Sequence, residues 1–293
     1  MNYVDLNSPM ELKEAAPKIS APTTFNVKFV LEKLTRNVVV ENCPVPFRVI
    51  LNGIIEGGSG LFFRYCRSVM VSNPRIVKPW ADGVNFSNCI NAALYHASIW
   101  GAGDEAVSIT GECGLVGIHS CILANTNQDH SCAFLSYGNI KKLLMVGNIL
   151  SGNNKRNPRC CHTGLFEFTQ NVVHDWGSKA MELGLSSNTP TQVKGPTTTV
   201  WNNAWIPSTL SKEPNIDVQH SSVALCTDGG ATINGVRTNY TNPDLSAEDM
   251  DYTKYSPELV LHNCKEKAGW LSSGQRWQID VDLLSRLSFS NKE

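Results

Sequence analysis

Residues 43–55 read CPVPFRVILNGII, and three later stretches also begin with cysteine: CRSVMVSNPRI (66–76), CINAALYHASIW (89–100) and CGLVGIHSCIL (113–123). The spacings between the four cysteines are 23, 23 and 24 residues. The same kind of segment returns after Asn139, Cys161 and Gly195. A period in the range of about 20 to 50 residues is typical of repeat architectures.

Each repeat contains short alternating runs rich in β-branched residues, separated by Asn, Ser or Gly, and shows no helical period. Coils of roughly 22 to 26 residues with tight corners predict an all-β fold, a right-handed parallel β-helix. Neighbouring coils of such a solenoid stack about 4.8 Å apart. Equivalent side chains of successive coils should therefore form ladders along the axis.

Composition excludes several classes of protein. The 293 residues are 42% hydrophobic and 17% charged, with a formal net charge of -1. This balance argues against a basic nucleic-acid-binding surface and against disorder. No apolar run reaches the roughly 18 residues that a membrane span requires. We expect no secretory signal peptide, because residues 1–17 lack a basic segment followed by an apolar one.

The ten cysteines and several asparagines fit ladders inside the solenoid. We expect free thiols in a small apolar stack. A zinc site at Cys160-Cys161-His162 is the alternative, and the lack of a second cysteine pair disfavours it. The asparagines that recur at one corner predict an internal amide ladder; they are Asn148, Asn171 and Asn202 or Asn203.

The two ends interrupt the repeat. We predict an N-terminal cap over residues 1–24, the β-helix over 25–210, and an irregular C-terminal region over 211–293. Ser8-Pro9-Met10-Glu11 is a capping box that opens a short helix. A last partial coil is expected near residues 221–235, and an amphipathic helix over 280–289 should cap the far end.

One column of polar residues stands out on this solenoid. Asp82, Asp104, His130 and Arg156 open equivalent runs at spacings of 22, 26 and 26 residues. If the period holds, the four side chains lie on one face, about one coil apart. Two carboxylates with a histidine and an arginine favour a functional site. The alternative is a set of corner residues that only make turn hydrogen bonds.

Three segments resemble the pectate lyase-like proteins, a family 1 polysaccharide lyase type of parallel β-helix. They are SIWGAGDEAVSIT (98–110), NNKRNPR (153–159) and TQNVVHDWG (169–177). The resemblance is strong over residues 74–184, weaker over 25–73 and absent beyond about residue 210. It implies cleavage of an acidic polysaccharide by Ca²⁺-assisted β-elimination.

The resemblance also implies roles for individual residues. Asp82 and Asp104 resemble calcium ligands, and Arg156 resembles the base or an electrostatic clamp, with His130 and Lys155 as further catalytic candidates. Arg159, Glu105 and Trp100 are expected to bind the substrate. Trp80, Trp176 and Trp201 are open to two interpretations, as sugar-stacking platforms or as core residues.

The chain departs from the family pattern at several positions. Ser108 stands where a second carboxylate is usual, so we expect a weakened calcium site. Cys161 stands in place of a second arginine, and Arg159 would have to replace it with a shifted geometry. The position of the family's lysine falls near His130 or Cys132.

These departures leave a second function open. A degenerate β-helix could bind glycans without cleaving them, as a virion tailspike, fibre or decoration protein. Such a protein would be made in the cytoplasm and associate with the virion, with a homotrimer as the expected assembly. A lyase without a signal peptide would instead reach the exterior by an unconventional route.

Overall fold

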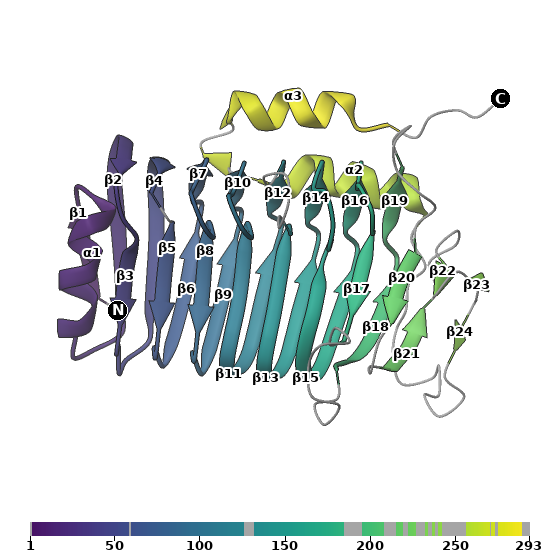
Figure 1. Ribbon diagram of the computed structural model, residues 1–293. Coiled ribbons are helices and arrows are strands. Elements are labelled where there is room, and N and C mark those ends of the chain that lie inside the picture. Colours follow the sequence, from purple (N-terminus) through teal and green to yellow (C-terminus); the bar gives the residue numbers. More distant parts are fainter. Residues whose placement is uncertain are drawn as a thin grey trace.

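The computed structural model confirms the predicted parallel β-helix, a solenoid of about eight turns (Figure 1). The described residues are 2–58, 60–125, 132–184, 195–207, 215–218, 222–226, 232–233, 236–237, 240–241, 256–269, 271–272 and 275–288. Within these residues we find no helix with the length and apolarity needed to cross a membrane.

Three parallel ladders run along the solenoid. Ladder A comprises β3 (Val38–Glu41), β5 (Leu61–Arg64), β8 (Val84–Ser87), the first parts of β11 (Val107–His119), β13 (Phe134–Val146) and β15 (Arg159–Thr169), then β17 (Met181–Leu183), β20 (Asn215–Val218) and β22 (Thr232–Ile233). Ladder B comprises β1 (Asn2–Leu6), the first parts of β2 (Thr23–Leu34) and β4 (Phe47–Gly57), β6 (Ser68–Ser72), β9 (Asn91–Tyr95), the second parts of β11, β13 and β15, then β18 (Thr197–Trp201) and β21 (Ser222–Cys226). Ladder C comprises the second parts of β2 and β4, β7 (Arg75–Val77), β10 (Ser98–Trp100), β12 (Ile122–Ala124), β14 (Ile149–Ser151), β16 (Val172–His174) and β19 (Ala204–Ile206).

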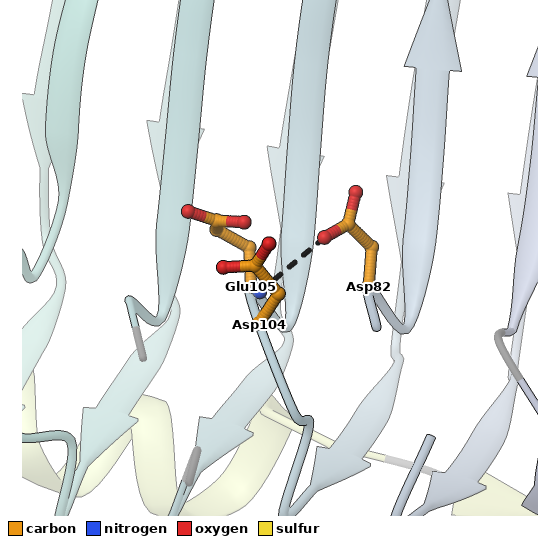
Figure 2. Close-up of side chains that lie close together, drawn as sticks. All are labelled: Asp82, Asp104 and Glu105. Carbon is orange, nitrogen blue, oxygen red and sulfur yellow. Dashed lines mark hydrogen bonds between the residues drawn. The ribbon is translucent and has the colours of Figure 1, made fainter. Parts of the chain in front are cut away.

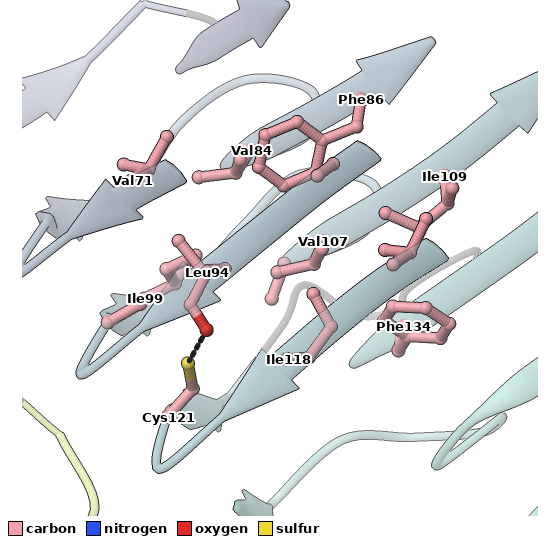
Figure 3. Packing of buried hydrophobic residues seen from close by; sticks show 14 of the residues in the cluster. Val71, Val84, Phe86, Leu94, Ile99, Val107, Ile109, Ile118, Cys121 and Phe134 are labelled. Atoms are coloured by element: carbon pink, nitrogen blue, oxygen red, sulfur yellow. Dashed lines mark hydrogen bonds between the residues drawn. The ribbon is translucent and has the colours of Figure 1, made fainter. Parts of the chain in front are cut away.

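The core fills the space between the three ladders. Val84, Val107 and Phe134 occupy one register position on successive coils of ladder A and are fully buried. Phe63 and Phe86 stack with ring centroids 5.5 Å apart. Figure 3 shows how such side chains interlock between coils. Because a single coil would leave these apolar groups in water, each coil needs its neighbours to be stable.

The cysteine and asparagine ladders both form. The nine cysteines whose side chains are described are free and buried, and Cys66 follows Cys43 and precedes Cys89 at the same place on successive coils of ladder A. The asparagine ladder uses Asn203 as its last member, and Asn171 accepts a hydrogen bond from the Asn148 amide at 2.9 Å. These buried amides satisfy one another and the backbone at the corner between ladders B and C.

The helices lie outside the solenoid of strands. Ser8 caps α1 (Pro9–Ala15), which covers the first coil as predicted, although Glu11 accepts from the Asn7 backbone rather than from that of Ser8. The predicted last helix is α3 (Gln278–Arg286). It does not cap the far end: α3 lies along the flank of the solenoid, with α2 (Pro257–Lys267) between it and the later coils (Figure 1).

The location of α3 follows from one buried carboxylate. Asp280 is fully buried and accepts hydrogen bonds from Ser98 and from Trp100 Nε1, the latter at 2.9 Å. Leu284 joins an apolar cluster with Ile122 of β12. The apolar face of α3, which was predicted to cap the far end of the solenoid, therefore packs on ladder C.

The three remaining strand pairs are short. β24 (Tyr240–Thr241) pairs antiparallel with β21, β23 (Val236–Arg237) pairs antiparallel with β22, and β25 (Leu271–Ser272) with β26 (Gln275–Arg276). Parallel pairing also reaches into the segment expected to be only an N-terminal cap, because β1 pairs with β2, and β20 pairs with β22 where a last partial coil was expected. A short 3₁₀ turn, Ala16–Lys18, follows α1.

Candidate functional site

The polar residues predicted from the sequence gather where ladder C turns into ladder A. Loops over residues 78–83, 101–106 and 152–158 lie at this corner, and Cys132 belongs to the loop between the second and the third. Backbone hydrogen bonds join them: Gly83 N donates to Glu105 O at 3.0 Å, and Ala106 N donates to Cys132 O at 3.1 Å. The corner therefore carries one side chain from each of several coils into a single line.

The strict register differs by one residue from the predicted column. Glu105, rather than Asp104, is level with Asp82, because each lies two residues before a paired valine of ladder A. Cys132 occupies the next level and pairs with Lys155 across the coils. The predicted member His130 lies outside the described residues. Loops of unequal length shift the column, since only the strands keep the period.

Asp82, Asp104 and Glu105 form an acidic cluster (Figure 2). One carboxylate oxygen from each lies within 4.8 Å of the others. The backbone N–H of Glu105 also donates to Asp82 Oδ1 at 3.3 Å. Asp104 is exposed and Glu105 is buried, so the cluster opens to solvent on the side of Asp104. Among the described residues this is the one group of three His, Cys, Asp or Glu side chains with such spacing.

Ser108 and Asn85 hold Asp82 from the strand side. The hydroxyl of Ser108 donates to Asp82 Oδ2, and Asn85 Nδ2 donates to Ser108 Oγ at 2.7 Å. Asn85 lies directly across from Ser108 in ladder A. Ser108 was predicted to stand in place of a carboxylate, whereas Asn85 was not among the predicted residues. The spacing of 23 residues between them, one coil, is the signal that could have joined them.

Burial shifts the acid–base properties of this cluster. Desolvation raises the pKa of Asp82, and the hydrogen bond from Ser108 partly offsets that effect. Desolvation, a hydrogen bond with Asp104 and the charges of Asp82 and Asp104 together raise the pKa of Glu105 to about 9. A carboxyl group with this pKa is mostly protonated at neutral pH. Clustered carboxyl oxygens are the ligands that Ca²⁺ prefers, so the residues present fit this ion.

Basic side chains lie further along the same corner. Arg156 Nη1 donates to Cys132 Sγ at 3.4 Å, and Arg156 Nε lies 3.2 Å from Glu182 Oε2. Lys179 Nζ lies 2.8 Å from Glu182 Oε1 and 2.5 Å from Asp217 Oδ2. The corner thus changes from acidic to basic along the axis, and two carboxylates interleave with the basic groups.

The Arg156 backbone adopts φ 65°, in the left-handed region that few residues other than glycine occupy. Its side chain remains 22% exposed. Eleven other described non-glycine residues also have a positive φ, each directly after a strand, so this conformation marks a turn of the coil. The conformation places a partly accessible guanidinium between Cys132 and Glu182.

The remaining predicted residues divide into two groups. Lys155 and Arg159 are both partly exposed at this corner, and Arg159 Nε donates to Cys161 Sγ at 3.2 Å. Trp100 does not fit its predicted role in substrate binding. It is 6% exposed and donates a hydrogen bond to Asp280, so its ring is not available to stack on a sugar. It reads as a site residue in the sequence because it precedes the acidic loop, but its side chain points toward α3.

The other tryptophans also differ in exposure. Trp176 is buried in the core and Trp201 is half-buried on ladder B. Trp80 is 68% exposed in the loop that carries Asp82. Of the tryptophans considered from the sequence, Trp80 is therefore the one that presents most of its ring to solvent beside the acidic cluster.

No protein-family model matches the chain. Among curated proteins, a probable pectate lyase C of Aspergillus flavus is 26% identical over 308 residues, which cover 96% of this chain and 70% of that protein. A probable pectate lyase C of Aspergillus oryzae is 25% identical over 302 residues, with 96% and 70% covered.

Two solved structures share the fold. Pectate lyase Bsp165PelA from Bacillus sp. N165, crystallised in complex with trigalacturonate, aligns with a TM-score of 0.59 and 12% identity over 92% of this chain and 94% of that one. Jun a 1, the major allergen from cedar pollen, aligns with a TM-score of 0.57 and 15% identity over 92% and 89%. Both likenesses extend well beyond the corner that holds the acidic and basic side chains.

Proposed function

Since the chain is a pectate lyase-like parallel β-helix protein, we propose that it cleaves an acidic, uronate-containing polysaccharide by Ca²⁺-assisted β-elimination. The observation that carries this proposal is the sequence of charges along one corner. The acidic cluster of Asp82, Asp104 and Glu105 is followed by Cys132 and then by Arg156. The trigalacturonate bound to the Bacillus enzyme suggests galacturonate as the first substrate to try.

In this reaction a base removes the proton from C5 of a uronate, a double bond forms between C4 and C5, and the bond from C4 to the glycosidic oxygen breaks. The leaving oxygen takes up a proton. Bound Ca²⁺, held by the acidic cluster, would neutralise the uronate carboxylate and so acidify the C5 proton. The chain's own task is to orient the sugar and to supply positive charge where negative charge develops.

Arg156 is suited to that electrostatic task. Burial alone would lower the pKa of Arg156, but Cys132, Glu182 and Glu105 more than offset this and raise it. A guanidinium that stays protonated stabilises the carboxylate as charge grows on it. We assign proton removal to a neighbouring base, and Lys155, whose backbone bridges to Cys132 on the adjacent coil, is the candidate among the described residues.

The first experiment measures formation of unsaturated uronate from polygalacturonate by its ultraviolet absorbance, with Ca²⁺ at alkaline pH. We expect Arg156→Gln to lower kcat by about a hundred- to a thousandfold, the usual cost of removing one group that stabilises transition-state charge. A chelator should abolish the absorbance change, and added Ca²⁺ should restore it.

Arg64→Gln is the matched control, because Arg64 also pairs with a glutamate on ladder A, Glu41, at 3.4 Å. That variant should keep wild-type activity. Equal loss in both variants would contradict the role of Arg156. If acidic oligosaccharides raise the thermal stability of the protein but none is cleaved, the non-catalytic glycan-binding function is the correct one.

A further inference from the structure

The basic part of the site is neutralised from within the chain. Glu182 lies between Arg156 and Lys179 and contacts both, at 3.2 Å and 2.8 Å. Its side chain is 17% exposed, less than that of either cation. A carboxylate of the protein therefore already occupies the place where cationic groups would meet a carboxylate of the substrate.

The way Arg156 is paired makes this competition direct. Arginine binds a carboxylate best through two parallel N–H groups on one edge of the guanidinium. In the structure Nε faces Glu182, and Nη1 donates to Cys132. A ligand carboxylate that uses the Nε edge must displace Glu182 from it.

Glu182 also forms an ion pair with a second cation, Lys179. Lys179 contacts Glu182 through Oε1, whereas Arg156 contacts Oε2, and Asp217 shares Lys179 at 2.5 Å. The Oε2 atom is buried and accepts no hydrogen bond within the described part of the chain, so charge alone holds it to Arg156. Arg156 can thus turn to a ligand while Lys179 keeps the buried carboxylate paired.

From these contacts we infer that Glu182 is a specificity-determining residue: it competes with the ligand's carboxylate for Arg156 and so sets how strongly the site binds acidic sugars. The inference rests on the proposed function, since it takes a uronate as the ligand. It adds a chain residue that lowers affinity for the substrate rather than raising it. A weakly acidic sugar would fail to displace Glu182, whereas a chain of uronates engages Arg156.

Calorimetric titration with trigalacturonate in the presence of Ca²⁺ tests this inference. Glu182→Gln keeps the shape of the side chain and removes its charge, and we expect it to tighten binding about three- to tenfold, the scale of one partly exposed ion pair. Asp217→Asn should give a smaller gain, because it leaves Lys179 to Glu182 alone and thereby loosens Glu182 from Arg156.

The matched control is Glu167→Gln. Glu167 also pairs with a lysine, Lys142, at 2.8 Å, but it lies on the outer face of ladder B. This variant makes the same change in net charge and should bind trigalacturonate like the wild type. A neutral trisaccharide of galactose should bind all variants alike, because it cannot compete with Glu182 for Arg156.

The outcomes separate the inference from the proposed function. If the wild type binds trigalacturonate and Glu182→Gln binds it equally or more weakly, the inference is wrong and the lyase proposal stands. If Glu182→Gln does not fold, as judged by circular dichroism, unchanged affinity in Asp217→Asn overturns the inference. If no variant binds trigalacturonate, both the substrate and the inference are wrong.

Discussion

At the scale of single residues, Ser108 occupies the position where related proteins were expected to carry a second carboxylate. Its hydroxyl donates to Asp82, and Asn85 donates to Ser108. A hydroxyl can orient Asp82 and favour its charged form, but it adds no negative charge for a cation. A cation bound here would therefore rely on the charges of Asp82, Asp104 and Glu105.

Restoring the charge should strengthen the site. We expect Ser108→Asp to raise Ca²⁺ affinity by at least about tenfold at alkaline pH, because affinity follows the number of charged ligands. Calorimetric titration with CaCl₂ measures the change. Ser68→Asp, on β6 of ladder B, adds the same charge away from the cluster and should leave affinity unchanged. An unaltered affinity in Ser108→Asp would mean that the cluster does not hold the ion.

Glu105 predicts how stability depends on pH. Its pKa is about 9 in the folded protein and near 4.5 in the unfolded chain, so the folded state binds more protons between these values. The contribution of Glu105 to stability is then complete below about pH 4.5 and is lost as pH rises toward 9. In the presence of a chelator, Tm should fall over this range.

The variant Glu105→Gln isolates this contribution, because it cannot ionise. Its Tm should fall less steeply between pH 5 and about pH 9 than that of the wild type. Ca²⁺ should recover Tm at high pH in the wild type and recover less of it in the variant. Parallel Tm profiles for the two proteins would show that Glu105 does not titrate as described.

The sequence predicted part of this residue set, and its failures have a physical cause. Period counting found Asp82 and Arg156, because each lies within two or three residues of a strand that keeps the period. It chose Asp104 instead of Glu105 because loops need not keep the register. It also stopped one coil early: Glu182 lies on the next coil, where it is level with Arg159 rather than with Arg156.

At the scale of elements, the asparagine ladder fixes the corner between ladders B and C. Asn171 is fully buried, and its Nδ2 donates to Met145 O at 2.9 Å and to Thr169 O at 3.0 Å. Its Oδ1 accepts a hydrogen bond from Asn148 Nδ2, and its Nδ2 donates to Asn203 Oδ1. Buried amides that lose such partners carry a large cost, so the ladder holds three coils in register.

Truncating the middle residue of this ladder should lower the stability of the fold. We expect Asn171→Ala to destabilise the fold by about 2–4 kcal/mol, because it leaves several buried groups without partners. Urea unfolding followed by circular dichroism measures the difference. Asn139→Ala removes an exposed asparagine that accepts from Thr163 at 2.8 Å, and its effect should stay within about 0.5 kcal/mol. Comparable effects from both would contradict a structural role for the ladder.

The placement of α3 illustrates what a repeat pattern cannot supply. The sequence predicts a helix near its position, since apolar residues recur at helical spacing there. Which surface it covers depends on long-range contacts: Asp280 binds Ser98 and Trp100, about 180 residues away, and Leu284 joins the cluster over ladder C. No local period contains that information, and the contact with Asp280 removes Trp100 from the candidate site.

At the scale of the whole molecule, stacking turns residues distant in the chain into neighbours. Asp82, Glu105 and Arg156 come from different coils and meet at one corner because every coil repeats the same path. The period of the cysteines was therefore enough to predict the fold, and it also predicted the corner at which the candidate residues Asp82 and Arg156 lie. The charges that balance this face, such as those of Glu182 and Asp217, became visible only in three dimensions.

We propose above all that this corner breaks a uronate chain by elimination, a claim that can be tested on a short substrate. The test is mass spectrometry of the products formed from trigalacturonate by the wild-type protein with Ca²⁺. Elimination adds no water, so the masses of the two products should sum to the mass of the substrate, and one product should carry the double bond. A sum that exceeds the substrate by one water would indicate hydrolysis, and an uncleaved substrate would indicate binding alone; either result would contradict the claim.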